Sequence, residues 1–327
     1  MAALNHGVVN PLGSRDSLFP EMDTLLMPAY QFIRNSVLPS FNWHTFDSVL
    51  NRYLETRLRL GSFDIDLFPL AACLAAGGSV ERAMPLTASW ILYVLAGRIF
   101  DDLSDGEGED RGLFPTAKIQ PRLSACLFAT SAAHVALSHL GDTEAYARIS
   151  AAFSQVLGLA VKSEDVRPTL DALSPQAYFE TVAAKTGVVF ATGAWAGGLL
   201  ATGKGPDAEE DIRRLYQYGL HVGMMVQILD DCRDLRVDLA NQVWTLPVVY
   251  AMSQPWSPQR ESVRSLLYDQ QEAGDDWVEQ AVTSLAQMGA IAWSLQFAEY
   301  HRQQAWDIAE TFLLNQYLRH YVIPKNQ

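Results

Sequence analysis

Apolar residues recur at helical spacing through most of the chain, and this pattern dominates the sequence. From about Thr45 onward they return every three to four positions, with no sustained alternation of the kind that builds strands. Glycine and proline interrupt the pattern at intervals and predict where helices end. The expected helices span residues 45–60, 67–77, 83–103, 118–139, 142–162, 175–202, 207–235, 242–253, 258–271, 275–287 and 290–320. We therefore predict an all-α protein, with a partly ordered N-terminal segment over 1–44 and one large helical domain over 45–327.

The composition supports a large core and argues against nucleic-acid binding. Of the 327 residues, 49% are hydrophobic and 19% are charged, which suits a folded domain rather than a disordered chain. Lys and Arg number 24 against 37 Asp and Glu, a formal charge of −13, whereas a nucleic-acid binder needs a basic face. The 3 cysteines have no Cys-x-x-Cys spacing, so we expect reduced thiols in a cytoplasmic protein. The apolar stretch Val188–Gly203 is broken by glycines and is too short for a transmembrane helix.

Two acidic clusters repeat one pattern, Asp-Asp-x-x-Asp, at the ends of two strongly apolar helices. They consist of Asp101, Asp102 and Asp105, and of Asp230, Asp231 and Asp234. A step of four residues returns to nearly the same helix face about 6 Å further along, so the first and third Asp of each cluster project side by side. Carboxylates at that spacing repel one another unless a cation lies between them, and Mg²⁺ prefers such oxygen ligands.

A single cluster of this kind is ordinarily a solvated helix end, but its repetition favours a metal-binding role over that explanation. The helix macrodipole disfavours Asp at a C-terminus, so three carboxylates there require compensation. Two copies, each closing an apolar helix, are hard to obtain from surface charge alone. If the two helices face each other, the clusters form an acidic mouth above an apolar pocket. Such a mouth suits a diphosphate that is bridged by metal ions and carries an apolar tail.

The motifs taken together resemble those of the trans-polyprenyl diphosphate synthase family, which has the class I isoprenoid synthase fold. Three of them stand in that family's order: Asp101–Asp105, Lys185-Thr186-Gly187, and Gly223–Asp234 with Gln227-Ile-Leu-Asp-Asp inside it. The flanking residues agree as well, namely Tyr178-Phe-Glu, Thr245-Leu-Pro247 and Met288-Gly-Ala-Ile291. The similarity spans about residues 45–325. No single motif would be specific, but the set is.

This resemblance implies a helical bundle around a central apolar cavity, with Mg²⁺ held by the two acidic clusters. Three ions are expected once substrate is bound, and Mn²⁺ is expected to substitute for Mg²⁺. In the family's pattern Asp101, Asp105 and Asp230 bind metal directly, while Asp102, Asp231 and Asp234 support them through water or hydrogen bonds. Lys185 would contact the diphosphate, and Gln227 and Arg111 are further substrate-binding candidates. The substrate would be a C10–C20 allylic prenyl diphosphate, whose loss of pyrophosphate leaves an allylic cation, and the protein would be a homodimer.

Several further side chains are candidates for the substrate pocket, each with a simpler structural explanation. A ring face stabilises a desolvated cation by about 0.5–2 kcal/mol, although most of the aromatics are expected to be ordinary core residues. The aromatics at helical spacing are Trp90, Tyr93, Phe100, Phe190 and Trp195, of which Tyr93 and Phe100 are the chosen pocket candidates. Arg233 is either a diphosphate contact or an ion-pair partner, and both interpretations stay open. Arg98 is expected to pair with Asp102, four residues further along the same helix.

The chain departs from the family where a second, basic site would bind isopentenyl diphosphate. Phe63-Asp-Ile-Asp66 stands where the family has Gly-Gly-Lys-Arg, so both cations are missing, and Arg57 and Arg59 lie nearby but out of register. Val94 replaces a His or Gln, and Val243 replaces a Lys. Each lost charge-assisted hydrogen bond removes about 1.5–3 kcal/mol. Binding of isopentenyl diphosphate should therefore be severely weakened, while ionisation of the allylic substrate is retained.

The leading hypothesis is a terpene synthase or cyclase, a lyase that captures the cation within its own substrate. The first alternative is a prenyltransferase, which either elongates with isopentenyl diphosphate or prenylates another acceptor. One feature favours that alternative, because the second motif is of the synthase type rather than the Asn/Asp-x-x-Ser/Thr-x-x-x-Glu common among dedicated cyclases. A non-catalytic partner subunit of a prenyl synthase is the alternative from another class. The six retained aspartates and Lys185 argue against it.

Overall fold

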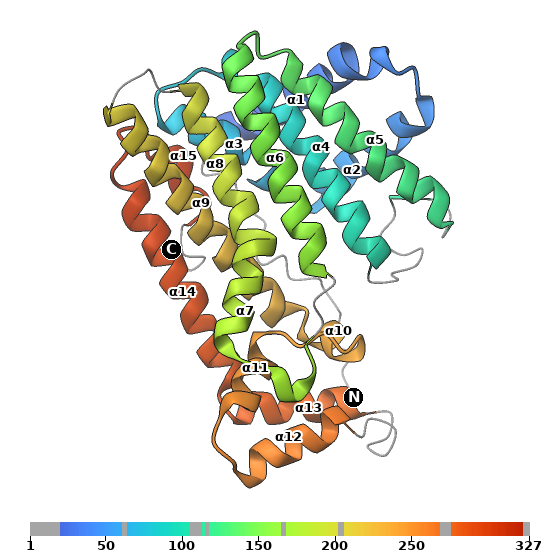
Figure 1. Cartoon of the computed structure of the whole chain (residues 1–327), viewed down its shortest axis with the longest axis vertical. Helices are drawn as coiled ribbons and strands as arrows, with labels where there is room; N and C mark the ends of the chain where they lie inside the picture. Colours follow the sequence, from blue (N-terminus) through green and yellow to red (C-terminus); the bar gives the residue numbers. More distant parts are fainter. Residues whose placement is uncertain are drawn as a thin grey trace.

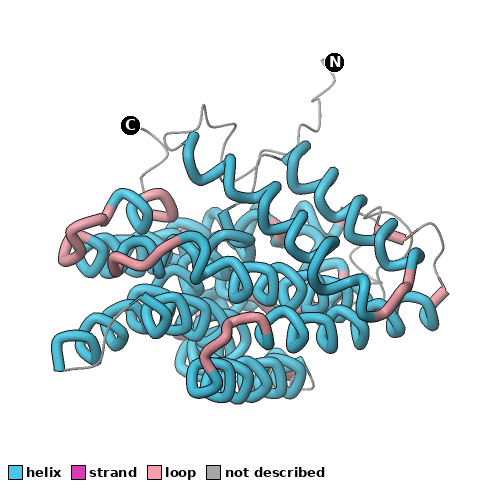
Figure 2. Tube along the Cα trace, turned by 90° about the horizontal axis from the view of Figure 1, so that it is seen from above, coloured by secondary structure: helices cyan, strands magenta, loops and turns pink. Residues whose placement is uncertain are grey.

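The chain forms helices joined by short loops wherever its structure is described. The computed structural model describes residues 20–60, 64–104, 113–114, 118–164, 168–201, 206–268 and 276–322. Within these ranges no β-strand occurs (Figure 2), which confirms the prediction of an all-α protein. The five longest helices are α4 (Val80–Ser104), α5 (Ile119–Ser138), α6 (Thr143–Glu164), α9 (Pro206–Arg233) and α14 (Ala290–Ala309).

Shorter helical elements complete the described fold. The α-helices are α1 (Pro20–Phe32), α2 (His44–Leu60), α3 (Phe68–Ala75), α7 (Pro175–Val182), α8 (Val188–Ala201), α10 (Leu235–Ala240), α11 (Leu246–Ser253), α12 (Pro258–Tyr268), α13 (Trp277–Gln287) and α15 (Gln316–Arg319). Two π-helical turns, η1 (Ile33–Val37) and η6 (Ala183–Gly187), and three 3₁₀ turns, η2 (Leu38–Ser40), η3 (Asp64–Leu67) and η5 (Leu170–Ala172), lie between them.

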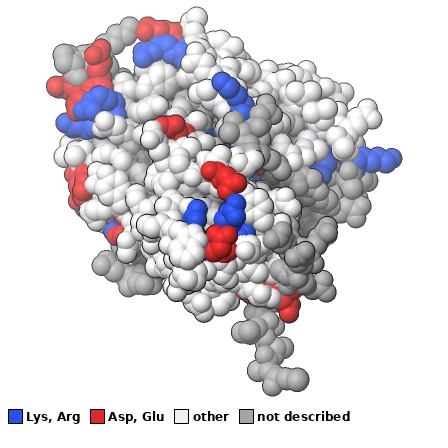
Figure 3. Space-filling view, turned by 60° about the horizontal axis from the view of Figure 1, so that its bottom comes forward, with Lys and Arg blue, Asp and Glu red and all other residues white. Residues whose placement is uncertain are grey.

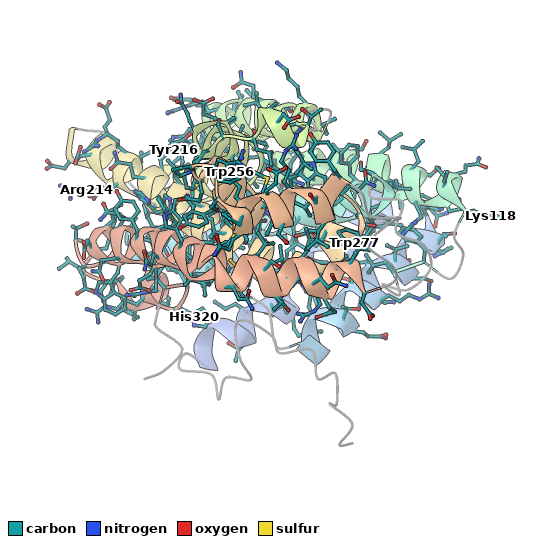
Figure 4. The ribbon with its side chains drawn as sticks, turned by 90° about the horizontal axis from the view of Figure 1, so that it is seen from below. Lys118, Arg214, Tyr216, Trp256, Trp277 and His320 are labelled. Atoms are coloured by element: carbon teal, nitrogen blue, oxygen red, sulfur yellow. The ribbon has the colours of Figure 1, made fainter. Side chains whose placement is uncertain are left out.

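The long helices form a bundle, and a smaller group of helices, α10 to α13, lies below it (Figure 1). The largest hydrophobic cluster lies in the bundle and draws on α1 to α6, α8 and α9. A second cluster belongs to the lower group, with Leu239, Val263 and Leu285 among its buried members. Seen from below, Lys118 at the start of α5 and Arg214 in α9 lie at opposite ends of the molecule (Figure 4). The two helices that carry the acidic clusters, α4 and α9, both belong to the bundle.

Close backbone contact between helices explains the glycines of the α8–α9 region. A Cβ atom added at Gly197 of α8 would lie 2.2 Å from the carbonyl oxygen of Pro69 in α3. One added at Gly219 of α9 would lie 2.5 Å from the carbonyl oxygen of Phe190 in α8. Only glycine permits these approaches, which pack α8 directly against its two neighbours. The position of α9 is therefore fixed by backbone contact.

The helix boundaries differ from the predicted ones at several places, including α10 (Leu235–Ala240), which lies between two predicted helices, and α11, which begins at Leu246 rather than at 242. The segment predicted as one helix over 175–202 is divided into α7, the π-turn η6 and α8, because η6 inserts extra residues into the helical ladder. The final long helix ends at Ala309 rather than at 320. Helix α1 lies in the segment where no helix was predicted, and it buries Leu26 and Tyr30 in the main core.

Helix α4 is buried inside the bundle. It is the one helix in the described ranges whose length and composition would suffice to cross a membrane. However, 67% of its most apolar window is buried inside the protein, as in the core helix of a water-soluble protein. We therefore interpret α4 as a core helix that carries the first acidic cluster on its C-terminal end.

Candidate functional site

The second acidic cluster lies at the C-terminal end of α9, and its middle carboxylate, Asp231, is buried and hydrogen-bonded. Asp231 is only 4% exposed and accepts hydrogen bonds from the Tyr178 hydroxyl at 2.5 Å and from the Gln227 side-chain amide at 2.8 Å. Burial raises the pKa of Asp231, and those hydrogen bonds together with the charge of Lys185 oppose the shift. The structure thus brings Asp231, Gln227 and Lys185, three residues singled out from the sequence, to one place.

Neighbouring elements hold this arrangement in position. Ser174 caps α7 by accepting a hydrogen bond from the backbone N–H of Ala177, which starts the helix that carries Tyr178. On the other side, the Thr186 hydroxyl of η6 donates to the Gln227 side-chain oxygen at 2.6 Å. That bond leaves the Gln227 amide N–H₂ free to donate to the Asp231 carboxylate. The chain Thr186–Gln227–Asp231 therefore couples the π-turn that carries Lys185 to the second acidic cluster.

A glycine of the second motif permits this coupling. A Cβ atom added at Gly223 would lie 2.8 Å from the carbonyl oxygen of Thr186 and 2.9 Å from the Cα atom of Gly187. Both atoms belong to the backbone of η6, so a larger residue at position 223 would push η6 away from α9. Gly223 and Gln227 are four residues apart and therefore lie on the same face of α9. Gly223 allows η6 to approach this face, and Gln227 accepts a hydrogen bond from Thr186 of η6.

Arg233 lies between the two outer carboxylates of the second cluster. Its guanidinium contacts Asp230 at 2.8 Å and Asp234 at 2.5 and 2.9 Å. Burial raises the pKa of Asp230 to about 6, with Arg233 opposing the shift and Asp234 and Asp231 adding to it. Figure 3 likewise shows carboxylates directly beside cations on the face at this end of the molecule. Arg233 is thus an ion-pair partner of Asp230 and Asp234 in this structure, and its contact with a diphosphate stays a prediction.

The carboxylates of this cluster are oxygen donors of the type that divalent cations bind. In the described part of the chain no group of three His, Cys, Asp or Glu side chains is arranged to hold a metal ion. In this arrangement Asp230 and Asp234 face Arg233, while Asp231 faces Tyr178 and Gln227. Because burial raises the pKa of Asp230, positive charge nearby favours its ionised form. Carboxylate oxygens of this kind suit Mg²⁺, and Asp230 is the member of this cluster that would bind it directly.

The first acidic cluster occupies the C-terminal end of α4. Asp102 is 3% exposed, whereas Asp101 is half-buried and adds to the rise in the pKa of Cys126 that burial causes. Asp105 and Arg111 lie outside the described residues. Helices α4 and α9 both run downward in Figure 1, so their C-terminal ends face the same end of the molecule. The two clusters therefore share one end of the bundle.

Open space lies beside α4 above the first cluster. Tyr93, Gly97 and Asp101 form one row on this helix, at steps of four residues, and a Cβ atom added at Gly97 would meet no atom within 4 Å. Tyr93 is 9% exposed, and Phe100 is half-buried near the same end. Along α4, Gly97 lies one turn from Tyr93 on one side and one turn from Asp101 on the other.

The other aromatic candidates belong to the core. Trp90 and Phe190 pack around Phe68, with ring centroids 5.0 to 6.5 Å apart. Trp195 has the guanidinium of Arg148 over its ring at 5.7 Å. For these residues the simpler explanation, ordinary packing, matches the contacts that the structure gives them.

A buried polar network occupies the position where the sequence lacks the basic isopentenyl diphosphate site. Asp66 is fully buried and accepts a hydrogen bond from the Tyr53 hydroxyl at 2.8 Å. Arg57 is 8% exposed and lies 3.3 Å from both oxygens of Asp66, and its Nε–H donates to the Tyr53 hydroxyl at 3.1 Å. Arg57 is therefore held by a carboxylate of the same chain.

Arg98 belongs beside this network. Its charge lowers the pKa of both Asp66 and Tyr53, against the larger effect of burial, which raises them. The buried Nε atom of Arg98 has no hydrogen-bond partner in the described residues. The sequence did not predict the contact of Tyr53 with Asp66. The contact could have been suspected from the four-residue spacing of Tyr53 and Arg57, which places both on one face of an amphipathic helix. A second indication was Asp66, an aspartate in an apolar segment that follows this helix.

Comparisons with known proteins agree with this fold. The chain resembles a geranylgeranyl pyrophosphate synthetase from the archaeon Geoglobus acetivorans, with 18% identity, 92% of this chain and 99% of that chain covered, and a TM-score of 0.73. It also resembles a polyprenyl synthase from Caulobacter crescentus solved with calcium and isoprenyl diphosphate, with 19% identity, 98% of both chains covered and a TM-score of 0.75. No curated protein matches the sequence. The sequence model described as Polyprenyl synthetase matches residues 99–285, and the chain belongs to this family.

Proposed function

We propose that the protein is a metal-dependent prenyltransferase that ionises a C10–C20 allylic prenyl diphosphate and passes the prenyl group to an acceptor. Membership of the polyprenyl synthetase family supports transfer, which the sequence analysis ranked below cyclisation. The observation that carries the proposal is the convergence of Lys185, Gln227 and Asp231 at the end of α9. An enzyme that expels pyrophosphate needs cations at that point and carboxylates that hold them.

Each part of this site has a role in the proposed reaction. Magnesium ions, when bound, would stabilise the negative charge that develops on the departing pyrophosphate. Asp101, Asp105 and Asp230 would bind the ions, and Asp102, Asp231 and Asp234 would support these ligands. Asp231 is already fixed by Tyr178 and Gln227, so it is the positioned member of its cluster. Lys185 would contribute a fixed positive charge on the diphosphate, from a turn that Thr186 ties to α9.

A second candidate is supported by the Arg57–Asp66 pair. Capture of the cation by a double bond of its own substrate needs no second diphosphate, so it needs no second basic site. The fully buried carboxylate of Asp66 would repel a diphosphate placed beside it, and Arg57 is already engaged. This observation favours a terpene synthase, or transfer to an acceptor without a diphosphate, over elongation with isopentenyl diphosphate.

Product analysis distinguishes these reactions. The purified protein with Mg²⁺ is offered the C10, C15 and C20 allylic diphosphates singly, each with and without isopentenyl diphosphate. A longer diphosphate that forms only with isopentenyl diphosphate establishes elongation. A hydrocarbon or alcohol that forms without it, together with pyrophosphate, establishes the second candidate. Absence of pyrophosphate release from every substrate would contradict both.

A double variant separates an enzyme from a non-catalytic partner subunit. Asp101→Ala with Asp230→Ala removes one predicted metal ligand from each cluster, so an enzyme loses all turnover. A partner subunit keeps its effect on an active synthase. Arg213→Met is a matched control, because this residue forms an exposed ion pair on the opposite half of α9. Circular dichroism on each variant confirms that the helices are retained.

We also propose that the protein forms a homodimer through α5. Ile119, Leu123 and Leu127 repeat every four residues on α5 and are 69%, 48% and 62% exposed. The sequence has no Lys, Arg, Asp or Glu from 123 to 141, although 19% of the chain is charged. Depletion of charge is typical of the core of a protein interface. A second copy related by a two-fold axis supplies a matching uncharged face.

A further inference from the structure

A chain of hydrogen bonds crosses three helices of the bundle. The Tyr93 hydroxyl of α4 lies 2.9 Å from Nε2 of His134 in α5, and Nδ1 of His134 lies 2.9 Å from the Ser150 hydroxyl of α6. Burial lowers the pKa of His134, so its ring is neutral at neutral pH. A neutral imidazole has one N–H and one free lone pair. It can therefore accept the Tyr93 proton at Nε2 while Nδ1–H donates to Ser150.

This hydrogen-bonded chain stands at one end of the space beside α4. Tyr93 is eight residues before Asp101 on the same helix, a distance of about 12 Å along the axis. Gly97 lies between them and faces open space. Tyr93 keeps 9% of its surface exposed, and its ring meets Phe153 edge-on at 5.1 Å. Burial raises the pKa of Tyr93 to about 12, and its hydroxyl also has a hydrogen bond with Ser154 of α6. A hydroxyl coupled to an imidazole thus lies about two helical turns from the first acidic cluster.

The proposed reaction produces a proton that must leave the substrate. When an allylic cation ends as a neutral alkene, one C–H bond breaks, its electron pair becomes the new double bond, and the proton passes to a base. A base beside the acidic clusters serves a cation that is captured where it forms. A base about 12 Å away serves a cation that has moved along the substrate through ring closure. The position of Tyr93 fits the second situation.

We propose that Tyr93, His134 and Ser150 form the proton acceptor that ends the reaction at the far end of the substrate pocket. The Tyr93 oxygen takes the proton from carbon while its own hydroxyl proton passes to Nε2 of His134. The products are the alkene and an imidazolium whose Nδ1–H remains bonded to Ser150. The half-buried His134 then returns the proton to solvent. This inference rests on the proposed ionisation and specifies intramolecular capture of the cation.

The test compares pyrophosphate release with product identity. Tyr93→Phe removes the hydroxyl alone, and His134→Gln keeps a hydrogen-bonding side chain that does not take up a proton. We expect both variants to release pyrophosphate within about threefold of the unmodified protein. The main alkene should fall at least tenfold relative to alcohols and other alkenes, because a positioned acid or base contributes about 10²–10⁴-fold. Tyr300→Phe, which removes an exposed phenol of α14 outside this chain, should leave the products unchanged.

Each other outcome counts against a defined part of the inference. Normal pyrophosphate release with unchanged product ratios in both variants would overturn the proton acceptor and leave the ionisation intact. An unmodified protein that yields only elongated diphosphates would do the same, since the cation is then captured beside the metal ions. No pyrophosphate release from the unmodified protein would overturn the proposed function, and the proton acceptor with it.

Discussion

Removing one partner of the Arg57–Asp66 pair should destabilise the protein far more than removing both. The two side chains are 8% and 0% exposed, so either one left alone is an uncompensated charge in the core. Such a loss costs about 3–5 kcal/mol, whereas replacing both partners with apolar residues of similar volume is often neutral or stabilising. We expect Arg57→Met and Asp66→Leu each to lose about 3 kcal/mol or more. The double variant should lose less than about 1 kcal/mol.

Urea unfolding at pH 7 measures these free energies, and the pH dependence of Arg57→Met provides a second check. Burial raises the pKa of Asp66, and removal of Arg57 takes away the main opposing charge. The folded variant then binds more protons than the unfolded chain between the unfolded and folded pKa values of Asp66. Its stability must therefore increase as the pH falls through that window. The loss caused by Arg57→Met should be smaller at pH 5 than at pH 7.

The matched control is Arg213→Met, which removes an exposed ion pair with Glu210. Exposed pairs contribute about 0–1 kcal/mol, so this variant should unfold almost like the unmodified protein. Single losses below about 1 kcal/mol at position 57 or 66, or losses that simply add in the double variant, would refute the reasoning. Arg57 would then be available to an anion, and elongation with isopentenyl diphosphate would regain support.

Three further measurements test other parts of the structure. Gly219→Ala should cost about 1–3 kcal/mol in urea unfolding, because its Cβ atom would lie 2.5 Å from a backbone oxygen, while Gly158→Ala, which meets no atom within 4 Å, should be neutral or stabilising. Burial and a neighbouring histidine lower the pKa of His301 to about 4. Stability should therefore fall between about pH 6.5 and 4, where the unfolded chain binds more protons, and His301→Gln should flatten that fall. Leu123→Lys with Leu127→Lys should convert the proposed dimer to a monomer by light scattering; an unchanged mass would place any interface elsewhere.

Helical periodicity was sufficient to predict most of the helices. A long amphipathic or apolar segment can satisfy its backbone hydrogen bonds only as a helix, so α4, α5, α6 and α9 follow from local pattern alone. The division of 175–202 did not follow, because the apolar pattern runs through it without interruption. The π-turn there packs closely against Gly223 of α9, about forty residues later in the chain. A contact between such distant residues cannot be predicted from the local sequence.

The candidate site shows the same division between local and distant information. The spacing of the aspartates predicted that the members of each cluster differ in orientation, and Asp231 is indeed held apart from Asp230 and Asp234. The sequence left two interpretations of Arg233, because an adjacent carboxylate and a bound diphosphate attract a guanidinium equally well. The pairing of Arg57 with Asp66 joins α2 to a 3₁₀ turn, and its burial depends on how α1, α2 and α4 pack together.

The charges of the described residues support the proposal of one diphosphate site rather than two. At the end of α9, Asp231 accepts hydrogen bonds from two neutral donors, whereas Asp230 and Asp234 are paired with the guanidinium of Arg233. The guanidinium of Arg57, in contrast, is neutralised by the carboxylate of Asp66 in the core of the protein. A buried guanidinium that is already paired must lose its carboxylate partner before it can bind an anionic substrate, and breaking a buried pair is costly. The acceptor for the prenyl cation should therefore be uncharged, whether it is another molecule or the far end of the same one.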